Sequence, residues 1–212
     1  IYNAYPGIKV YKPLDANEMI EMLFYALEKG EPIALSAVRP DMMVFKRNNG
    51  IPPAKEATNG AYVFYTTPNP ELRTPNSNVV LVVCGGQTMA NTMEAVPELE
   101  KQGLDVKIVA VTSPQLFEEL RKNNPEKANA IFSDEDRERA ITIHNGWKGF
   151  LYPFLLPKDY VARTIAIDTY LKSGNPKEVY ALAGLTSEDI KEKVERAVSF
   201  RTHDHSRGEE SF

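Results

Sequence analysis

Cysteine is almost absent from this sequence of 212 residues, which contains only Cys84. A single cysteine cannot form an intrachain disulfide, so we expect a reducing compartment, with the cytoplasm as the default. Long apolar runs are missing as well, because a stretch such as residues 79–84 is far shorter than the roughly 20 residues that span a bilayer. We therefore expect neither a secretory signal nor a membrane partner.

Clustered positive charge is also lacking. The 25 Lys and Arg residues are outnumbered by 29 Asp and Glu residues, which leaves a formal net charge of −4 and no basic run. A general nucleic-acid binder needs clustered cations to neutralise phosphates, so we expect no nucleic-acid partner. Hydrophobic residues make up 42% of the chain and charged residues 25%, which is typical of a globular protein with a sizeable core.

Strands and helices are expected to alternate in the first part of the chain. Residues 8–12 alternate as in a strand, and Asp15 and Glu18 form a variant of the capping box that begins a helix. Gly30 is suited to end that helix, and the apolar run at residues 33–38 is typical of a buried strand. This order predicts a βαβ unit with parallel strands.

A linker is expected at residues 67–78, which contain three prolines and few apolar side chains. A short strand at residues 62–66 precedes it. Beyond it the sequence predicts strands at 79–84, 106–111, 139–143 and 161–167, with helices between and after them. We therefore expect an α/β fold, with a mostly parallel sheet and flanking helices. The expected division is a first domain at 1–66, the linker, a second domain at 79–200 and a polar tail at 201–212.

The turn Gly85-Gly86 joins a predicted strand to a predicted helix, a geometry that can hold an anion. Two glycines also make a tight turn without any ligand, and this simpler interpretation is favoured because neither GxGxxG nor GxxxxGK[ST] occurs. Cys84 next to the turn is interpreted as a small buried residue rather than a nucleophile with His144 as its base. His144 itself ends a strand, at the edge where α/β proteins bind ligands.

Arg39 follows the predicted strand at residues 33–38. At the carboxyl end of a parallel strand, its guanidinium could contact a phosphate or carboxylate in bidentate fashion. A salt bridge to a nearby acid such as Asp41 is an equal alternative. The potential metal ligands His203, Asp204 and His205 lie in the polar tail, where a fixed coordination geometry is not expected.

The order of these segments resembles transketolases. The stretch Pro6-Gly7-Ile8-Lys9-Val10-Tyr11-Lys12-Pro13-Leu14-Asp15-Ala16-Asn17-Glu18, followed by a helix and a strand, resembles the end of their pyrimidine-binding domain. Residues 79–200 look like their carboxyl-terminal domain, with Val-Cys-Gly-Gly-Gln-Thr in place of the family's Gly-Ser turn and Gly-Leu-Asp-Val-Lys-Ile-Val-Ala-Val after it. The chain begins with Ile1 instead of methionine, and we expect it to be a piece of a longer protein.

The resemblance implies an enzyme that moves a two-carbon ketol unit between sugar phosphates, with thiamine diphosphate and a magnesium ion as cofactors, and a homodimer. The family's Gly-Asp-Gly metal motif has no counterpart here, so this fragment is expected to bind neither cofactor and to be inactive by itself. Arg39 matches the arginine that contacts the substrate phosphate in the family. Val38-Arg39-Pro40 departs from the family's Ser-Arg-Gln, which leaves open a deoxyxylulose-phosphate synthase or a 2-oxo-acid dehydrogenase subunit. An anion-binding regulatory module, with the Gly85-Gly86 turn as its site, is a separate alternative, because the α/β domain supplies no evident catalytic group.

Overall fold

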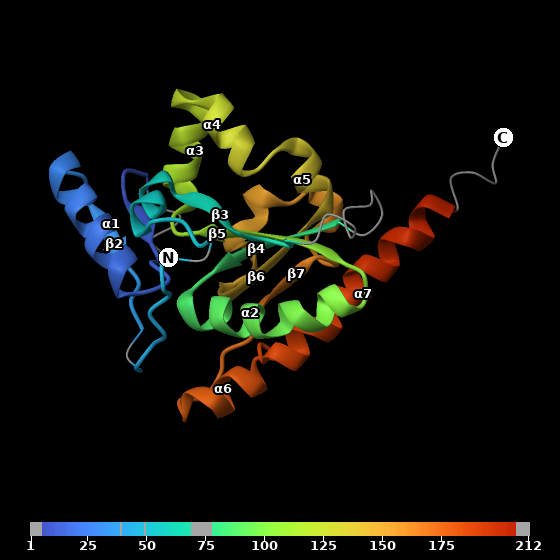
Figure 1. The fold of residues 1–212 in the computed structure, drawn as a ribbon. Coiled ribbons are helices and arrows are strands. Elements are labelled where there is room, and N and C mark those ends of the chain that lie inside the picture. Colours follow the sequence, from blue (N-terminus) through green and yellow to red (C-terminus); the bar gives the residue numbers. More distant parts are fainter. Residues whose placement is uncertain (1–5, 39, 49, 69–77, 207–212) are drawn as a thin grey trace.

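The computed structural model describes residues 6–38, 40–48, 50–68 and 78–206 (Figure 1). Within these residues the regular structure consists of seven strands in two sheets, seven α-helices and three short 3-10 helices. The strands are β1 (Lys9–Tyr11), β2 (Ile33–Leu35), β3 (Ala61–Thr66), β4 (Asn78–Cys84), β5 (Asp105–Val111), β6 (Ala140–Trp147) and β7 (Thr164–Ile167). The helices are α1 (Ala16–Lys29), α2 (Gly86–Lys101), α3 (Pro114–Asn123), α4 (Pro125–Ile131), α5 (Asp134–Arg139), α6 (Pro176–Leu182) and α7 (Ser187–Ser206). The 3-10 helices are η2 (Ala54–Asn59), η4 (Lys148–Phe154) and η5 (Pro157–Asp159).

The first unit is the predicted βαβ, in which β1 and β2 pair in parallel. Its helix α1 begins where the side chain of Asp15 accepts a hydrogen bond from the backbone N–H of Glu18. It ends at Gly30, whose φ of 63° lies in the left-handed region that favours glycine. Strand β2 ends at Leu35 and not at Val38 as predicted, because pairing with the three-residue β1 stops there.

The second sheet has five strands in the order β3-β5-β4-β6-β7. Strands β4, β5, β6 and β7 run parallel, and β3 alone in this sheet is antiparallel, at the edge beside β5. All side chains of the apolar run 79–84 in β4 are buried. A central strand covered on both faces needs apolar side chains in every position, and that is why the run is continuous.

Helices cover both faces of the five-stranded sheet (Figure 1). On one face, α2 and α7 pack over side chains such as Leu81 and Ile108. On the other, the α3–α5 segment and η4 pack over Val80 and Val109, with the stacked rings of Phe117 and Phe154 at the centre. The first unit lies at one end of this layered structure, beside α3 and η2. The expected α/β fold with a mostly parallel sheet and flanking helices is thus confirmed.

Two segments differ from their predicted places. Residues 61–66, which we grouped with the first domain, form β3 and pair with β5 of the second sheet. Helix α7 continues to Ser206, so the first six residues of the expected tail are helical, and residues 207–212 lie outside the described part. The division of the chain into domains stays a prediction. No helix within the described ranges is both long and apolar enough to cross a membrane.

Candidate functional site

The carboxyl ends of the parallel strands in the two sheets meet at Lys12. This residue follows β1 directly, and its backbone N–H donates to the carbonyl oxygen of Thr112, which follows β5, over 2.8 Å. Its Nζ donates to Oδ1 of Asn145 over 3.0 Å, and Asn145 lies in β6 one position beyond the pair formed with the last residue of β4. Because α/β proteins bind ligands at the carboxyl edge of their sheets, this junction is the candidate site.

Among the residues that the structure describes, only neutral groups contact the ammonium of Lys12. Besides Asn145, the ring of Phe150 lies 5.4 Å from Nζ, measured to the ring centroid, in a cation–π arrangement. Asn145 in turn donates from Nδ2 to the hydroxyl of Tyr180 over 2.9 Å. No carboxylate of the described residues forms an ion pair with Lys12.

His144 lies at the same edge and is fully buried. Its Nδ1 accepts the backbone N–H of Gly146 over 3.3 Å, so the neutral ring carries its proton on Nε2. Nε2 has no hydrogen-bond partner within the described part of the chain. Burial lowers the pKa of His144 to about 3, the positive charge of Lys12 adds to this effect, and the backbone of Lys148 opposes it. The imidazole is therefore neutral at ordinary pH.

Cys84 and His144 are register partners in the neighbouring strands β4 and β6. No hydrogen bond between described residues joins the thiol to the imidazole, and both side chains are buried. Burial raises the pKa of the Cys84 thiol, with Lys12 acting in the opposite sense. A nucleophilic cysteine needs a thiolate that substrate can reach. The buried, neutral thiol of Cys84 beside a neutral imidazole therefore indicates a packing role. Sequence reasoning missed their proximity, although parallel neighbouring strands would have indicated it.

The Gly85-Gly86 turn is closely packed. At Gly85 the φ of 100° lies in the region that favours glycine. A Cβ at Gly86 would lie 2.0 Å from the carbonyl oxygen of Leu14 and 1.8 Å from Cε of Met42. The space before the amino terminus of α2 is thus filled by the chain itself, and the second glycine is needed so that the segment after β1 can approach.

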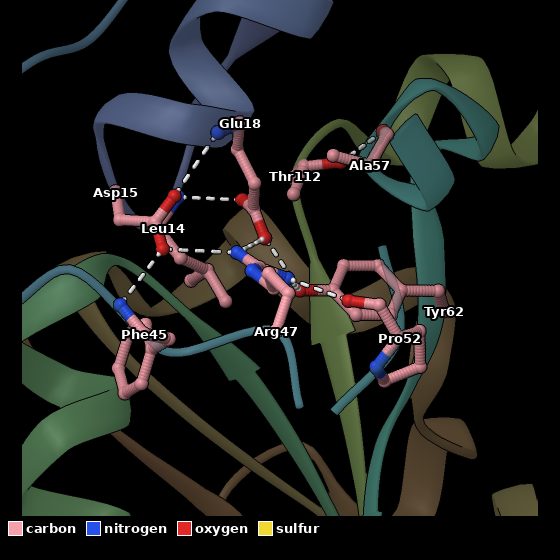
Figure 2. Close-up of polar contacts among 9 residues, drawn as sticks. All are labelled: Leu14, Asp15, Glu18, Phe45, Arg47, Pro52, Ala57, Tyr62 and Thr112. Atoms are coloured by element: carbon pink, nitrogen blue, oxygen red, sulfur yellow. Dashed lines mark hydrogen bonds and ion pairs between the residues drawn. The ribbon is translucent and has the colours of Figure 1, made fainter. Parts of the chain in front are cut away.

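A buried ionic cluster, drawn in Figure 2, lies beside this edge. Nη2 of Arg47 is 3.0 Å from Oδ2 of Asp15 and 2.9 Å from Oε1 of Glu18. Nη1 of Arg47 donates to the hydroxyl of Tyr62 over 2.9 Å, and that hydroxyl donates to Glu18. The side chains of Asp15 and Glu18 are 0% exposed and that of Arg47 is 12% exposed. The cluster joins the start of α1, the segment after β2 and strand β3.

Backbone groups complete the cluster, and burial shifts its pKa values. Asp15 accepts the N–H of Phe45 over 3.1 Å, and Glu18 accepts the N–H of Leu14 over 2.7 Å. Burial raises the pKa of Glu18, and the hydrogen bonds and Arg47 act against this rise. Burial acts to lower the pKa of Arg47, but Tyr62 and Glu18 outweigh it and raise the pKa above its ordinary value. The sequence indicated the capping role of Asp15 but not its pairing with Arg47.

Comparison with known proteins identifies the family. The family model described as "Transketolase, C-terminal domain" matches residues 71–190, more than half of the chain. The chain belongs to this transketolase family. Transketolase 1 of Saccharomyces cerevisiae is 22% identical over 200 residues, which cover 94% of this chain and 26% of that protein. A transketolase of Staphylococcus aureus is 26% identical over 195 residues, which cover 90% of this chain and 27% of that protein.

A solved structure supports the fold. The transketolase from Leishmania mexicana matches with a TM-score of 0.69 and 15% identity, over 93% of this chain and 26% of that one. This chain therefore spans about a quarter of the length of the curated transketolases that it matches. The expected resemblance to the transketolase family is confirmed.

The described residues do not fit the cofactors that the transketolase family implies. No three His, Cys, Asp or Glu side chains in the described part of the chain are placed to hold a metal ion. The buried carboxylates of Asp15 and Glu18 are both engaged by Arg47. The Gly85-Gly86 turn, the one candidate for a diphosphate, is closed by Leu14 and Met42. The side chains of His203, Asp204 and His205 lie outside the described part.

Arg39, the substrate-binding residue expected from the transketolase resemblance, lies outside the described residues. Its neighbours Val38 and Pro40 are described and exposed. The backbone N–H of Ser36 donates to the carbonyl oxygen of Tyr11 over 2.8 Å, three residues before Arg39. The role of Arg39 therefore stays a prediction.

Proposed function

We propose that this chain is the carboxyl-terminal portion of a cytoplasmic transketolase-like enzyme that transfers a two-carbon ketol unit between sugar phosphates. The observation that carries the proposal is the match of residues 71–190 to the transketolase carboxyl-terminal domain. The similarity to curated transketolases extends beyond that domain and covers 90% or more of the chain. The family resemblance also supports a homodimer.

Thiamine diphosphate and magnesium belong, on this proposal, to other parts of the complete enzyme. They supply the chemistry that holds the two-carbon unit during transfer. This chain contributes the edge of the sheet that helps to enclose the active site. It also contributes Arg39, whose guanidinium is suited to a substrate phosphate. We expect the 212-residue chain alone, with both cofactors added, to transfer no ketol unit from xylulose 5-phosphate to ribose 5-phosphate. Transfer above the rate without protein would contradict this division of roles.

An open apolar surface supports a place in a larger assembly. On the outer side of α1, Ile20, Phe24 and Leu27 are 54%, 63% and 77% exposed, and their spacing places them on one stripe. A groove of about 540 Å³ lies along β1 and β2, lined by apolar residues such as Val10 and Ile33. Two parallel strands are rarely stable without further strands and cover on both faces. We propose that the remaining part of the transketolase-like enzyme packs on the stripe of Ile20, Phe24 and Leu27, which we name the α1 surface.

Charge substitutions test the α1 surface. Phe24→Glu combined with Leu27→Glu should prevent association with the remaining part of the enzyme, because two carboxylates would have to be buried without partners. Val161→Glu is the control, since Val161 is 93% exposed and lies outside this surface. The measurement is size-exclusion chromatography of the 212-residue chain, original or variant, mixed with the separately produced remaining part of the enzyme. Assembly of the double variant as complete as that of the control would count against this surface.

Substrate specificity tests the role of Arg39. In the complete enzyme, Arg39→Ala should raise the KM for phosphorylated donors at least tenfold, because a charged hydrogen bond to phosphate is lost, and should leave unphosphorylated donors little changed. Lys46→Ala is the matched control, because Lys46 is an exposed cation of the same segment. Equal losses for both kinds of donor would remove the phosphate role and favour a relative that acts on 2-oxo acids.

A further inference from the structure

The charge of Lys12 is compensated differently from that of three other partly buried cations, Lys9, Lys107 and Arg47. Lys9 pairs with Glu31 and, over 2.7 Å, with Glu119. Lys107 pairs with Asp136 over 2.6 Å. Arg47 likewise pairs with two carboxylates in the buried ionic cluster, whereas Lys12 has an amide oxygen and an aromatic ring instead. A partly desolvated ammonium with only dipolar partners leaves a net positive charge in its surroundings.

The groups around Lys12 do not cancel this charge. His144 is a neutral ring, and the Asn145 amide that contacts the ammonium is linked onward to the Tyr180 hydroxyl. The carboxylates that follow Lys12 in the chain, Asp15 and Glu18, are both bound by Arg47. Burial is the main cause of the lowered pKa of His144 and of the raised pKa of Cys84. The charge of Lys12 adds to the first shift and opposes the second, and Glu18 acts on the pKa of Cys84 in the opposite sense to Lys12. Its positive potential therefore extends over the carboxyl edge of β4 and β6.

The position of Lys12 is suited to a ligand. It is the first residue after β1, and the adjacent residue after β2 is Ser36, whose N–H bonds the end of β1. Thus Lys12 lies where the carboxyl edges of both sheets come together. An ammonium has three N–H donors, and Asn145 accepts one of them. The others are available to an oxyanion, and Asn145 and Phe150 hold the ammonium in place for it.

We propose that Lys12 is an anion-binding residue that accepts a phosphate group at the junction of the two sheets. The proposal rests on the proposed function, which supplies sugar phosphates as substrates. Binding would pair the ammonium with a charged acceptor in place of solvent, a stronger interaction than its contacts to Asn145 and Phe150. Nothing in the family resemblance assigns a role to this position.

Titration of the 212-residue chain tests the proposal. Inorganic phosphate, ribose 5-phosphate and ribose are added separately, and the backbone amide shifts of Asn145 and Gly146 are followed by NMR. We expect shifts with both phosphates and none with ribose. Tighter binding of ribose 5-phosphate than of inorganic phosphate would assign the site to the sugar phosphate, and equal binding would assign it to phosphate alone. Absence of shifts at millimolar phosphate would overturn the proposal.

Variants separate binding from a purely structural role. Lys12→Met keeps the stem but removes the charge, and should weaken phosphate binding roughly tenfold or more. Asn145→Asp gives the ammonium a carboxylate partner while keeping the lysine, and should weaken binding similarly. Lys12→Arg should stay within a few-fold of the original, and Lys158→Met, at an exposed lysine, should change nothing. Thermal unfolding of each variant verifies that it is folded.

Two results would contradict the inference about Lys12. If Lys12→Met lowers the melting temperature but leaves the phosphate affinity unchanged, Lys12 only joins the two sheets. If Asn145→Asp binds phosphate as well as the original chain does, the free charge is not the binding determinant. Failure of the proposed function is distinct from both, because it would be seen as absence of ketol transfer by the complete enzyme while phosphate binding by this chain still depends on Lys12.

Discussion

Burial of His144 predicts that the protein loses stability on acidification. Burial lowers the folded-state pKa to about 3 from an ordinary value of 6.5. Below pH 6.5 the unfolded chain therefore binds a proton that the folded chain does not bind. The stability that this residue contributes is complete above pH 6.5 and is lost as the pH falls toward 3, because stability rises with pH wherever the unfolded state holds more protons.

The size of the effect follows from these two pKa values. Between pH 8 and pH 5 the unfolded histidine becomes almost fully protonated and the folded one does not. This linkage lowers the free energy of unfolding by about 2 kcal/mol. For a domain of this size, that loss corresponds to a fall of roughly 4–8 °C in melting temperature.

Comparison of the original chain with His144→Gln separates the effect of His144 on stability from that of other titrating groups. The free energy of unfolding is measured by urea denaturation at pH 8 and pH 5 for the original chain and for His144→Gln, which cannot titrate. The loss on acidification should be about 2 kcal/mol smaller in the variant. His203→Gln combined with His205→Gln is the control and should behave as the original, since these are the two remaining histidines. An equal loss in the original and in His144→Gln would refute the reasoning.

The remaining predictions concern packing and buried charge. Gly86→Ala should cost roughly 1–3 kcal/mol or more of the free energy of unfolding, because its Cβ would overlap the Leu14 carbonyl. Gly174→Ala, whose Cβ would meet its neighbours at 3.4 Å or more, is the control, and equal losses would contradict a special need for glycine at residue 86. Arg47→Met should cost roughly 3–5 kcal/mol by leaving two buried carboxylates unpaired. Lys101→Met is the control, because Lys101 belongs to an exposed ion pair, and it should change the free energy of unfolding by less than about 1 kcal/mol. A similarly small loss in Arg47→Met would show that the buried ionic cluster contributes little to stability.

Local patterns were sufficient to predict most of the elements. The apolar run at residues 79–84 became the central strand β4, and the Asp15 and Gly30 signals correctly placed the ends of α1. These signals are local, since a cap or a turn is formed by residues a few positions apart. Helices α4 and α5 were missed because each has only six or seven residues, too few for a periodic apolar pattern.

Sheet membership was only partly predictable. A strand was predicted at residues 62–66 and forms β3, but its partner β5 lies about 45 positions further along the chain. Alternating apolar side chains show that a strand has a buried face, and they do not identify the sheet to which it belongs. The sheet that a strand joins depends on which sheet edge is free once the parallel strands have paired. The free edge is a property of the folded chain.

By itself, the sequence determined the α/β class and the family, and it predicts a phosphate role for Arg39. Only the tertiary structure decided that Lys12 reaches Asn145, 133 positions away, and that Arg47 pairs with both Asp15 and Glu18. The physical reason is that a charge on an irregular segment carries no periodicity that predicts its partner. Its environment is set by long-range packing, and that packing decides which charges are paired and which remain available to a ligand.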